Sequence, residues 1–171
     1  MDRHVHHELR SAITALTVAA ICAPLTVNVH GTLFGPGGLH LFLAGLIGFP
    51  VLLTLLQATR IKWIGEIGDF ETAVALPEPP AEKSLLRHPL NPWLFAMMTP
   101  VTLGLAFAWE PATALLPLWP ALAWLGRAWL AAEWERRHHK TLWRGHNPEK
   151  PWRLSLTPRP LTRTATDALP E

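Results

Sequence analysis

The chain has 171 residues, of which 49% are hydrophobic and only 16% charged, and its formal net charge is +2. This length suits one modest domain, so small a charge gives no support for nucleic-acid binding, and the single cysteine, Cys22, excludes an internal disulfide. Nine tryptophans and a mean hydropathy of +0.17 are typical of a protein whose aromatic side chains lie at a membrane interface.

Four apolar segments each approach the roughly 20 residues that a helix needs to cross about 30 Å of hydrocarbon. They cover residues 13–29, 39–59, 93–109 and 112–132. The sequence therefore predicts an all-α polytopic membrane protein whose transmembrane domain covers residues 1–146. The first segment lacks a small-residue cleavage site and is predicted to be a retained helix. The last two contain internal prolines, so a hairpin that only dips into one leaflet is the alternative for them.

The lysines and arginines predict the orientation of these helices. Apart from Arg127, they fall at the N-terminus, in residues 60–87 and in the tail after Glu135, whereas the connections 28–38 and 109–111 have none. A four-helix topology places those three stretches on one side of the membrane. By the positive-inside bias that side is the cytoplasm, so both termini are predicted to be cytoplasmic in a bacterial-type inner membrane.

The polar segments are predicted to have little regular structure. Residues 61–70 predict a short interfacial helix, and residues 75–81 predict a polyproline-like chain. The proline-rich tail 147–171 is predicted to be extended or disordered in the cytoplasm. The basic stretch 136–140 with Arg144 predicts a juxtamembrane anchor to anionic lipid.

Two charged clusters flank the predicted hairpin of the last two helices. The tripeptide Arg87-His88-Pro89 precedes the third segment, and the sequence Glu133-Trp-Glu-Arg-Arg follows the fourth. Proline suits the first turn of a helix, and a basic pair at the edge of a bilayer needs water, headgroups or a polar ligand. Since both clusters are predicted at the same membrane face, they predict a pocket for a charged ligand.

With these two clusters, Gly145 and the later Pro158-Arg159, the chain from about Leu85 to Pro160 resembles the isoprenylcysteine carboxyl methyltransferase family and the related phospholipid N-methyltransferases. The resemblance implies that S-adenosylmethionine binds at the cytosolic end of the hairpin and that its methyl group passes to a lipid-like or membrane-embedded acceptor. Carboxylates suit the ammonium group of that cofactor, and arginine suits its carboxylate. The cofactor-binding residues that the resemblance implies are Arg87, His88, Pro89, Glu133, Glu135 and Arg136.

The chain also departs from the family pattern. Asn91 and Trp93 stand where the family has a tyrosine and a glycine, and Trp134 separates the two glutamates. One alternative is therefore a scaffold of this kind without catalysis. Another is a non-catalytic accessory subunit of a larger respiratory or photosynthetic membrane complex, which would contact its neighbours through the tryptophan-rich surface.

The histidines support a further, different interpretation. His30 and His40 flank the first predicted outer loop and would suit haem iron or a chlorophyll magnesium, although hydrogen bonding to water is the simpler alternative. The histidine clusters near the two ends of the chain lack the spacing of a structural zinc site. The sequence contains no GxSxG, Walker-loop or paired-cysteine motif, so soluble hydrolase, kinase and redox functions have no support.

Overall fold

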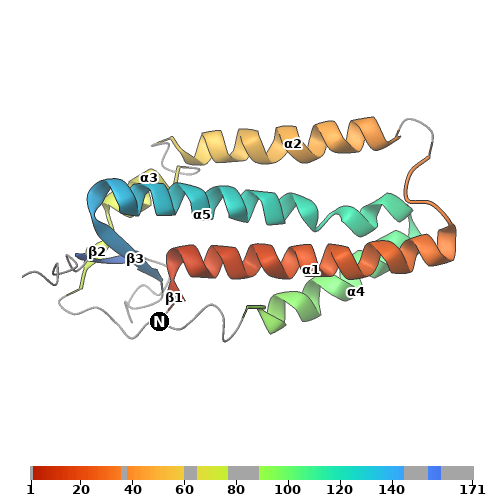
Figure 1. Cartoon of the computed structure of the whole chain (residues 1–171), viewed down its shortest axis with the longest axis horizontal. Coiled ribbons are helices and arrows are strands. Elements are labelled where there is room, and N and C mark those ends of the chain that lie inside the picture. The colour runs from red at the N-terminus through yellow and green to blue at the C-terminus, as the bar shows by residue number, and fades with distance from the viewer. Residues whose placement is uncertain (1, 36–37, 60–64, 77–88, 145–153, 159–171) are drawn as a thin grey trace, which may run out of the picture.

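The computed structural model describes residues 2–35, 38–59, 65–76, 89–144 and 154–158. Its long helices are α1 (His4–His30), α2 (Gly38–Gln57), α4 (Pro92–Ala108) and α5 (Leu118–His138). The short elements between them are helix α3 (Ile67–Glu71) and the 3-10 helix η2 (Pro111–Leu115). The long helices lie side by side, and a small sheet closes one end of the bundle (Figure 1).

The sheet has four strands in the order β1-β3-β4-β2. They are β1 (Asp2–Arg3), β3 (Lys140–Arg144), β4 (Leu154–Pro158) and β2 (Val74–Ala75). Strand β3 is antiparallel to β1 and β4, and β2 runs parallel to β4. The all-α prediction therefore holds for the bundle and is wrong for its end. The strands are short, and β1 and β2 pair with strands distant in the chain, so no local periodicity marks them.

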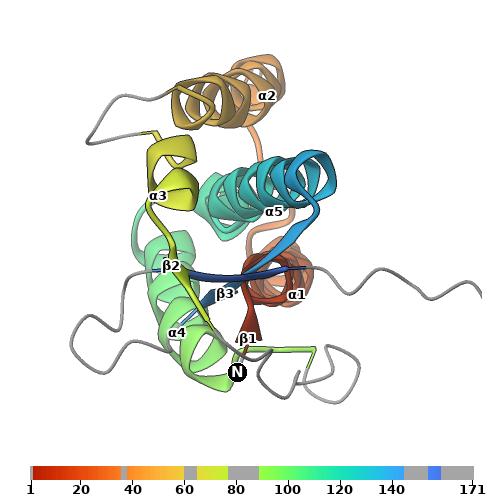
Figure 2. The same cartoon turned by 90° about the vertical axis from the view of Figure 1, so that its left-hand side faces the viewer.

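Because β1 and β4 lie in the same sheet, the first and last described strands share one end of the bundle (Figure 2). The predicted location of both termini on the cytoplasmic side of a membrane stays a prediction, since residues 159–171 lie outside the described structure. Strand β4 falls inside the segment predicted to be an extended or disordered tail. It is extended, and Ser155 and Thr157 on it are buried against the rest of the protein.

The helices differ from the predicted segments mainly at their ends. Helix α1 begins nine residues before position 13, and α5 continues past position 132 to His138. Both extensions contain polar residues and pack against the sheet, and this packing stabilises the helices beyond the apolar segments. Helix α5 ends where His139 adopts a left-handed conformation with φ of 51°, a common way to terminate a helix.

The start of α4 is held against the middle of α1. Asn91 caps α4, since its Oδ1 accepts a hydrogen bond from the amide of Leu94 at 3.2 Å, and Pro92 suits the first turn. The amide of Asn91 in turn donates to Thr14 Oγ1 on α1 at 2.8 Å. Thr14 lies ten residues, or about 15 Å, along α1 from His4, so α4 begins well inside the bundle (Figure 1).

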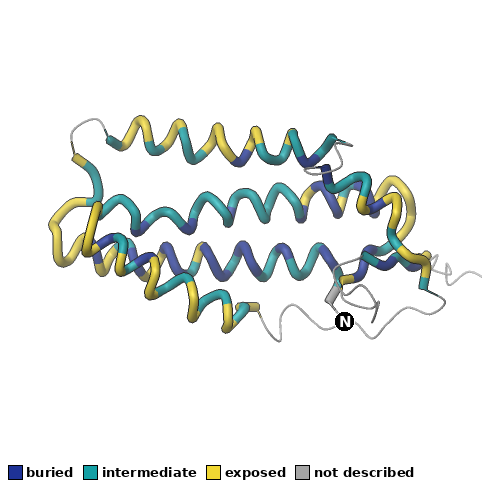
Figure 3. Tube along the Cα trace, turned by 180° about the vertical axis from the view of Figure 1, so that it is seen from behind, coloured by how far each residue is buried: buried dark blue, intermediate teal, exposed yellow. Residues whose placement is uncertain are grey.

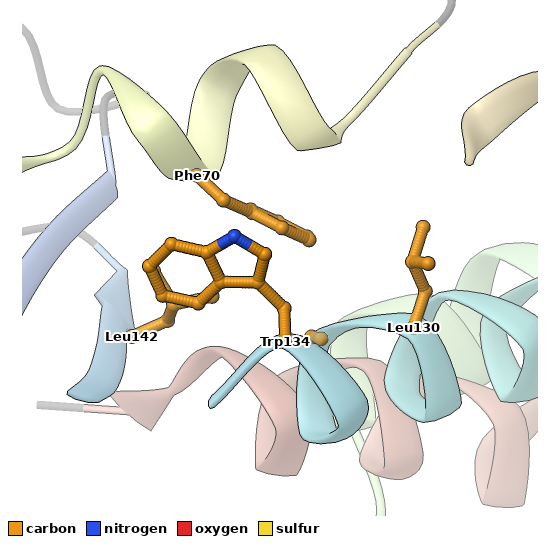
Figure 4. Packing of buried hydrophobic residues seen from close by; sticks show 5 residues of the cluster. Phe70, Leu130, Trp134 and Leu142 are labelled. Carbon is orange, nitrogen blue, oxygen red and sulfur yellow. The ribbon is translucent and has the colours of Figure 1, made fainter. Parts of the chain in front are cut away.

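The core under the sheet is aromatic. Phe70, Leu130, Ala131, Trp134 and Leu142 form one buried cluster. Figure 4 shows the ring of Phe70 lying over the indole of Trp134, with ring centroids 5.7 Å apart. This cluster joins α3, α5 and β3 and gives the sheet end a packed core of its own.

The apolar outer surface of the bundle is large. Helices α1 and α2 are long and apolar enough to cross a membrane, and only 6% of the apolar stretch of α2 is buried. Helix α2 packs chiefly on α5, where Gly126 meets Thr54. Figure 3 shows α2 and α4 mostly exposed or half-buried along their length. Two of the four predicted spans thus have the length and composition of membrane helices.

Candidate functional site

A polar cavity of about 160 Å³ lies at the sheet end of the bundle, the end that faces the viewer in Figure 2. It brings together side chains from α1, α3, α5, β3, β4 and the residue just before α3. The lining residues are His4, Glu8, Glu66, Asp69, Phe70, Arg127, Arg144 and Leu154. Three carboxyl groups and two guanidinium groups therefore meet where the apolar bundle gives way to the sheet.

Each guanidinium group in the cavity pairs with one carboxylate. Arg127 Nε lies 2.9 Å from Glu66 Oε1, and Arg144 Nη1 lies 3.2 Å from Glu8 Oε1. With its amide oxygen turned toward Arg127, Gln57 accepts from Nε at 3.0 Å and from Nη2 at 3.1 Å. The backbone oxygen of Gln57 also accepts from the amide of Glu66 at 2.9 Å. The end of α2 and the start of α3 are thus both attached to Arg127 of α5.

The second oxygen of each of these two carboxylates, Oε2, accepts no hydrogen bond within the described structure. Glu8 Oε2, Glu66 Oε2 and both ring nitrogens of His4 are buried and have no hydrogen-bond partner within the described structure. His4 is 5% exposed and Glu8 is 2% exposed, so bulk water does not compensate these atoms. The His4 ring meets the Phe70 ring edge to face at 5.8 Å, and its Nδ1 is 4.0 Å from Glu8 Oε1.

Burial also affects the ionisation of Glu66, which lies in the connection between α2 and α3. Desolvation raises the pKa of the Glu66 carboxyl group above its ordinary value, and the neighbouring Arg127 charge acts in the opposite direction. The carboxylate is thus less stable than it would be in water, even though it has a cationic partner. A ligand that donates a hydrogen bond to Oε2 would favour the ionised form.

An apolar groove of about 460 Å³ runs between α2 and α5 toward the cavity. Its lining is aliphatic and aromatic except at one end, where Gln57 and Arg127 lie. The lining residues are Phe49, Leu53, Gln57, Leu116, Trp119, Pro120, Ala123, Trp124 and Arg127. Arg127 therefore lines both the groove and the polar cavity. A second apolar groove, of about 380 Å³, follows the other flank of α2.

The two glutamates that the sequence analysis singled out have separate roles. Glu135 is 2% exposed, accepts from Arg3 Nε at 3.1 Å and accepts from the amide of Leu142 at 2.8 Å. Glu133 pairs instead with Arg136 and Arg137 on the outer surface of α5. The hydrogen bond from Arg137 holds the pKa of Glu133 below its ordinary value, with Arg136 adding to the effect. Residues two apart on a helix point about 200° away from each other, so the two carboxylates do not face one site.

The structure also separates the proline of the tripeptide from these glutamates. Arg87 and His88 lie outside the described residues, and Pro89 is exposed two residues before Asn91. Asn91 contacts Thr14, whereas Glu135 contacts Arg3, and these positions are about 16 Å apart along α1. Two residues of chain reach about 7 Å at most, so Pro89 does not lie beside Glu135. A cofactor pocket lined by both Pro89 and Glu135 would have to span the distance between them along α1.

The histidines that were considered as pigment ligands lie on the surface. His30 and His40 are both exposed, and the His30 ring stacks on Phe107 with centroids 5.9 Å apart. Within the described ranges, no group of three or more His, Cys, Asp or Glu residues is arranged to hold a metal ion. Ligation of haem or chlorophyll stays a prediction.

Sequence reasoning missed most of the cavity. Glu66 and Asp69 lie in a segment for which the sequence predicts only a short interfacial helix, and no sequence pattern singles out Glu8. The available signal was Arg127, a charge inside an apolar helix, which implies a buried partner or a route to water. The sequence alone does not identify its partners, Glu66 and Gln57.

These features define a class of protein: a mostly helical chain with two helices suited to a membrane and a charged cavity under a small sheet. No protein family, curated protein or solved structure matches the chain.

Proposed function

We propose that this chain is an integral protein of a bacterial cytoplasmic membrane, crossed by α1, α2, α4 and the segment that η2 and the apolar part of α5 form together. Arg127 lies about 12 Å from Glu135 along α5, and Thr14 lies about 16 Å from Arg3 along α1. The two helices are antiparallel and the Arg3–Glu135 pair joins their ends, so Arg127 and Thr14 lie at similar depths. Gln57 contacts Arg127 and Asn91 contacts Thr14, which supports a common inner boundary for all four helices. Beyond this boundary, α1, α2 and α4 extend a further 24 to 29 Å or so, close to the thickness of a hydrocarbon core.

The exposed aromatic residues support the same placement. Trp93 begins α4 and is 74% exposed, whereas Trp109 follows its end and is 80% exposed. Tryptophans at both ends of an apolar helix are typical of the two interfaces of a bilayer. The sheet and the polar cavity then lie on the inner side, where the positive-inside bias puts the basic segments.

The function that the geometry supports best is binding of a lipid-like amphiphile between α2 and α5. The observation that carries this proposal is the position of Arg127, which ends the apolar groove and lines the polar cavity. The groove volume, about 460 Å³, lies within the range of small-molecule sites, and the groove offers an acyl chain an apolar wall. Arg127 is 38% exposed and provides a cation for an anionic headgroup.

Methyl transfer to this amphiphile is the reaction class that the family resemblance suggests. The described polar cavity, at about 160 Å³, is smaller than typical cofactor sites. S-adenosylmethionine would therefore have to bind with residues 77–88, which include Arg87 and His88. Purified protein in detergent is expected to bind radiolabelled S-adenosylmethionine at millimolar concentration, and absence of binding would remove methyl transfer while leaving the amphiphile site intact.

Amphiphile binding is tested with 9,10-dibromostearate, whose bromine atoms quench tryptophan fluorescence on contact. Trp119 and Trp124 line the groove, so we expect saturable quenching in detergent micelles, reduced when both are replaced by Phe. Arg127→Gln should raise the midpoint about tenfold, the loss expected for one charge-assisted contact. The matched control, Arg137→Gln, alters an exposed arginine of the same helix and should leave the midpoint unchanged. Quenching that never saturates, or equal midpoints for both variants, contradicts the proposal.

A second candidate function is that of an accessory subunit in a larger membrane complex. The observation that favours it is the exposure of α2, which offers an apolar surface on both flanks. Extraction from native membranes in a mild detergent should then recover the protein with other chains. Recovery as a solitary monomer counts against this function and is compatible with amphiphile binding.

A further inference from the structure

We propose that the polar cavity binds a small protonated amine. Its first support is the pattern of used and unused oxygens. In both Glu8 and Glu66, Oε1 pairs with an arginine, and Oε2 is buried without a hydrogen-bond partner in the described chain. Both residues line the cavity, and their Oε2 atoms, which accept hydrogen bonds when ionised, receive none from the arginines. A ligand with several N–H donors that reached both oxygens would satisfy them.

The charge of the lining favours a cation. With a neutral His4 and all three carboxyl groups ionised, the lining holds the carboxylates of Glu8, Glu66 and Asp69 against the guanidinium groups of Arg127 and Arg144, which leaves one negative charge. Burial raises the pKa of the Glu8 and Glu66 carboxyl groups, and a bound cation would favour their ionised forms. A single positive charge neutralises it, whereas an anion would add to the excess. This neutralisation matters because a buried, uncompensated charge is strongly unfavourable.

The chemistry of His4 narrows the class of cation. This side chain is 95% buried, lines the cavity, and has neither ring nitrogen hydrogen-bonded within the described structure. A neutral imidazole has one acceptor nitrogen, which suits an N–H donor and is a poor ligand for sodium or potassium. The neighbouring Phe70 ring offers an aromatic surface that attracts ammonium groups. These features favour an ammonium group as the cation.

The size of the cavity limits the ligand to a small group. A volume of about 160 Å³ corresponds to a few water molecules, so methylammonium or a similar ion fits and a nucleoside does not. The amine can be a free ion or the ammonium group of a zwitterionic amphiphile, whose anionic group would lie at Arg127 where the cavity meets the apolar groove. The common chemistry is an N–H-rich cation held between Glu8, Glu66 and His4.

The test is calorimetric titration of the purified protein in detergent at pH 7 and constant ionic strength. Methylammonium should bind saturably, whereas tetramethylammonium, which has the same charge and no N–H group, should not. Dodecylammonium identifies the source: an affinity equal to that of methylammonium indicates a free ion, and a much higher affinity indicates the headgroup of an amphiphile. Equal binding of tetramethylammonium or sodium overturns the proposal, and so does the absence of binding by any amine, which would mean that water fills the cavity.

Variants locate the site. Glu8→Gln and Glu66→Gln should each weaken methylammonium binding at least about tenfold, because each removes a charged acceptor. Asp69→Asn changes an exposed residue of α3, so it should fold normally and weaken binding less, by the loss of charge alone. Glu133→Gln is the matched control, since this carboxylate pairs with Arg136 and Arg137 outside the cavity. Unchanged affinity in folded Glu66→Gln and Asp69→Asn, or an equal loss in Glu133→Gln, overturns the assignment.

Discussion

Replacement of Glu135 by alanine should destabilise the junction between the bundle and the sheet. The carboxylate is 2% exposed and receives hydrogen bonds from Arg3 of β1 and from the amide of Leu142 in β3. It therefore ties the first strand and the third to α5 at one point. Alanine removes both contacts and leaves the Leu142 amide, which is buried, without an acceptor.

The magnitude follows from these two contacts. An unsatisfied buried amide costs about 1–3 kcal/mol, and breaking a buried ion pair costs about 3–5 kcal/mol. The Arg3 side chain is 26% exposed and remains partly hydrated, so the ion-pair loss is smaller than in a fully buried site. We expect a loss of about 3 kcal/mol in the free energy of unfolding, which corresponds to a fall of roughly 6–12 °C in Tm for a chain of this size.

The assay is thermal unfolding in dodecyl maltoside, followed by near-ultraviolet circular dichroism. Glu133→Ala is the matched control, because this residue lies two positions earlier on the same helix and makes only surface ion pairs. Its Tm should stay close to that of the wild type, because exposed ion pairs contribute little to stability. A fall in Tm below 2 °C for Glu135→Ala, or an equal fall in both variants, would refute the bracing role. If Glu135 instead contacts S-adenosylmethionine, Glu135→Gln should abolish cofactor binding at nearly unchanged Tm.

Three further predictions concern the packing of the helices and the titration of the cavity. Gly126→Ala should lower stability by about 1–3 kcal/mol, because its Cβ would collide with Thr54 Oγ1. The double variant with Thr54→Ala should recover most of this loss in Tm, whereas Gly104→Ala, with nothing within 4 Å of its Cβ, should lose none. Thr14→Val should lower the free energy of unfolding by about 1–2 kcal/mol and speed amide hydrogen exchange at Asn91, because the Asn91 amide loses its acceptor. Thr17→Val is the control, since it removes a hydrogen bond within α1 and should not affect the Asn91 amide. Since burial raises the pKa of Glu66 above 4.5, the unfolded chain releases this proton first, so the contribution of Glu66 to stability should fall as pH rises above 4.5. The difference in Tm between the wild type and Glu66→Gln should therefore shift against the wild type over this range, and a difference that does not change with pH would mean that this carboxyl group ionises alike in both states.

The apolar segments determined the bundle. Runs of about 20 apolar residues have few alternatives to a helix, and Pro92 and the left-handed Gly31 mark helix ends that can be read locally. The distribution of basic residues predicts the orientation of the helices in a membrane, which stays a prediction. These properties depend on short stretches of sequence and on the energy of apolar side chains, so they need no knowledge of what the chain contacts.

The tertiary structure alone decided the sheet and the site. Strands β1 and β3 lie at opposite ends of the chain, and their pairing depends on Glu135 meeting Arg3 across 132 positions. The same holds for Arg127 and Glu66, whose partnership turns a lone charge in an apolar helix into the wall of a cavity. Glu133 and Glu135 lie two residues apart on α5, and helical geometry therefore directs one to the outer surface and the other toward the sheet. Only the packing of α1, α3 and α5 determines which charged groups lose water together, and that loss gives the cavity its chemistry.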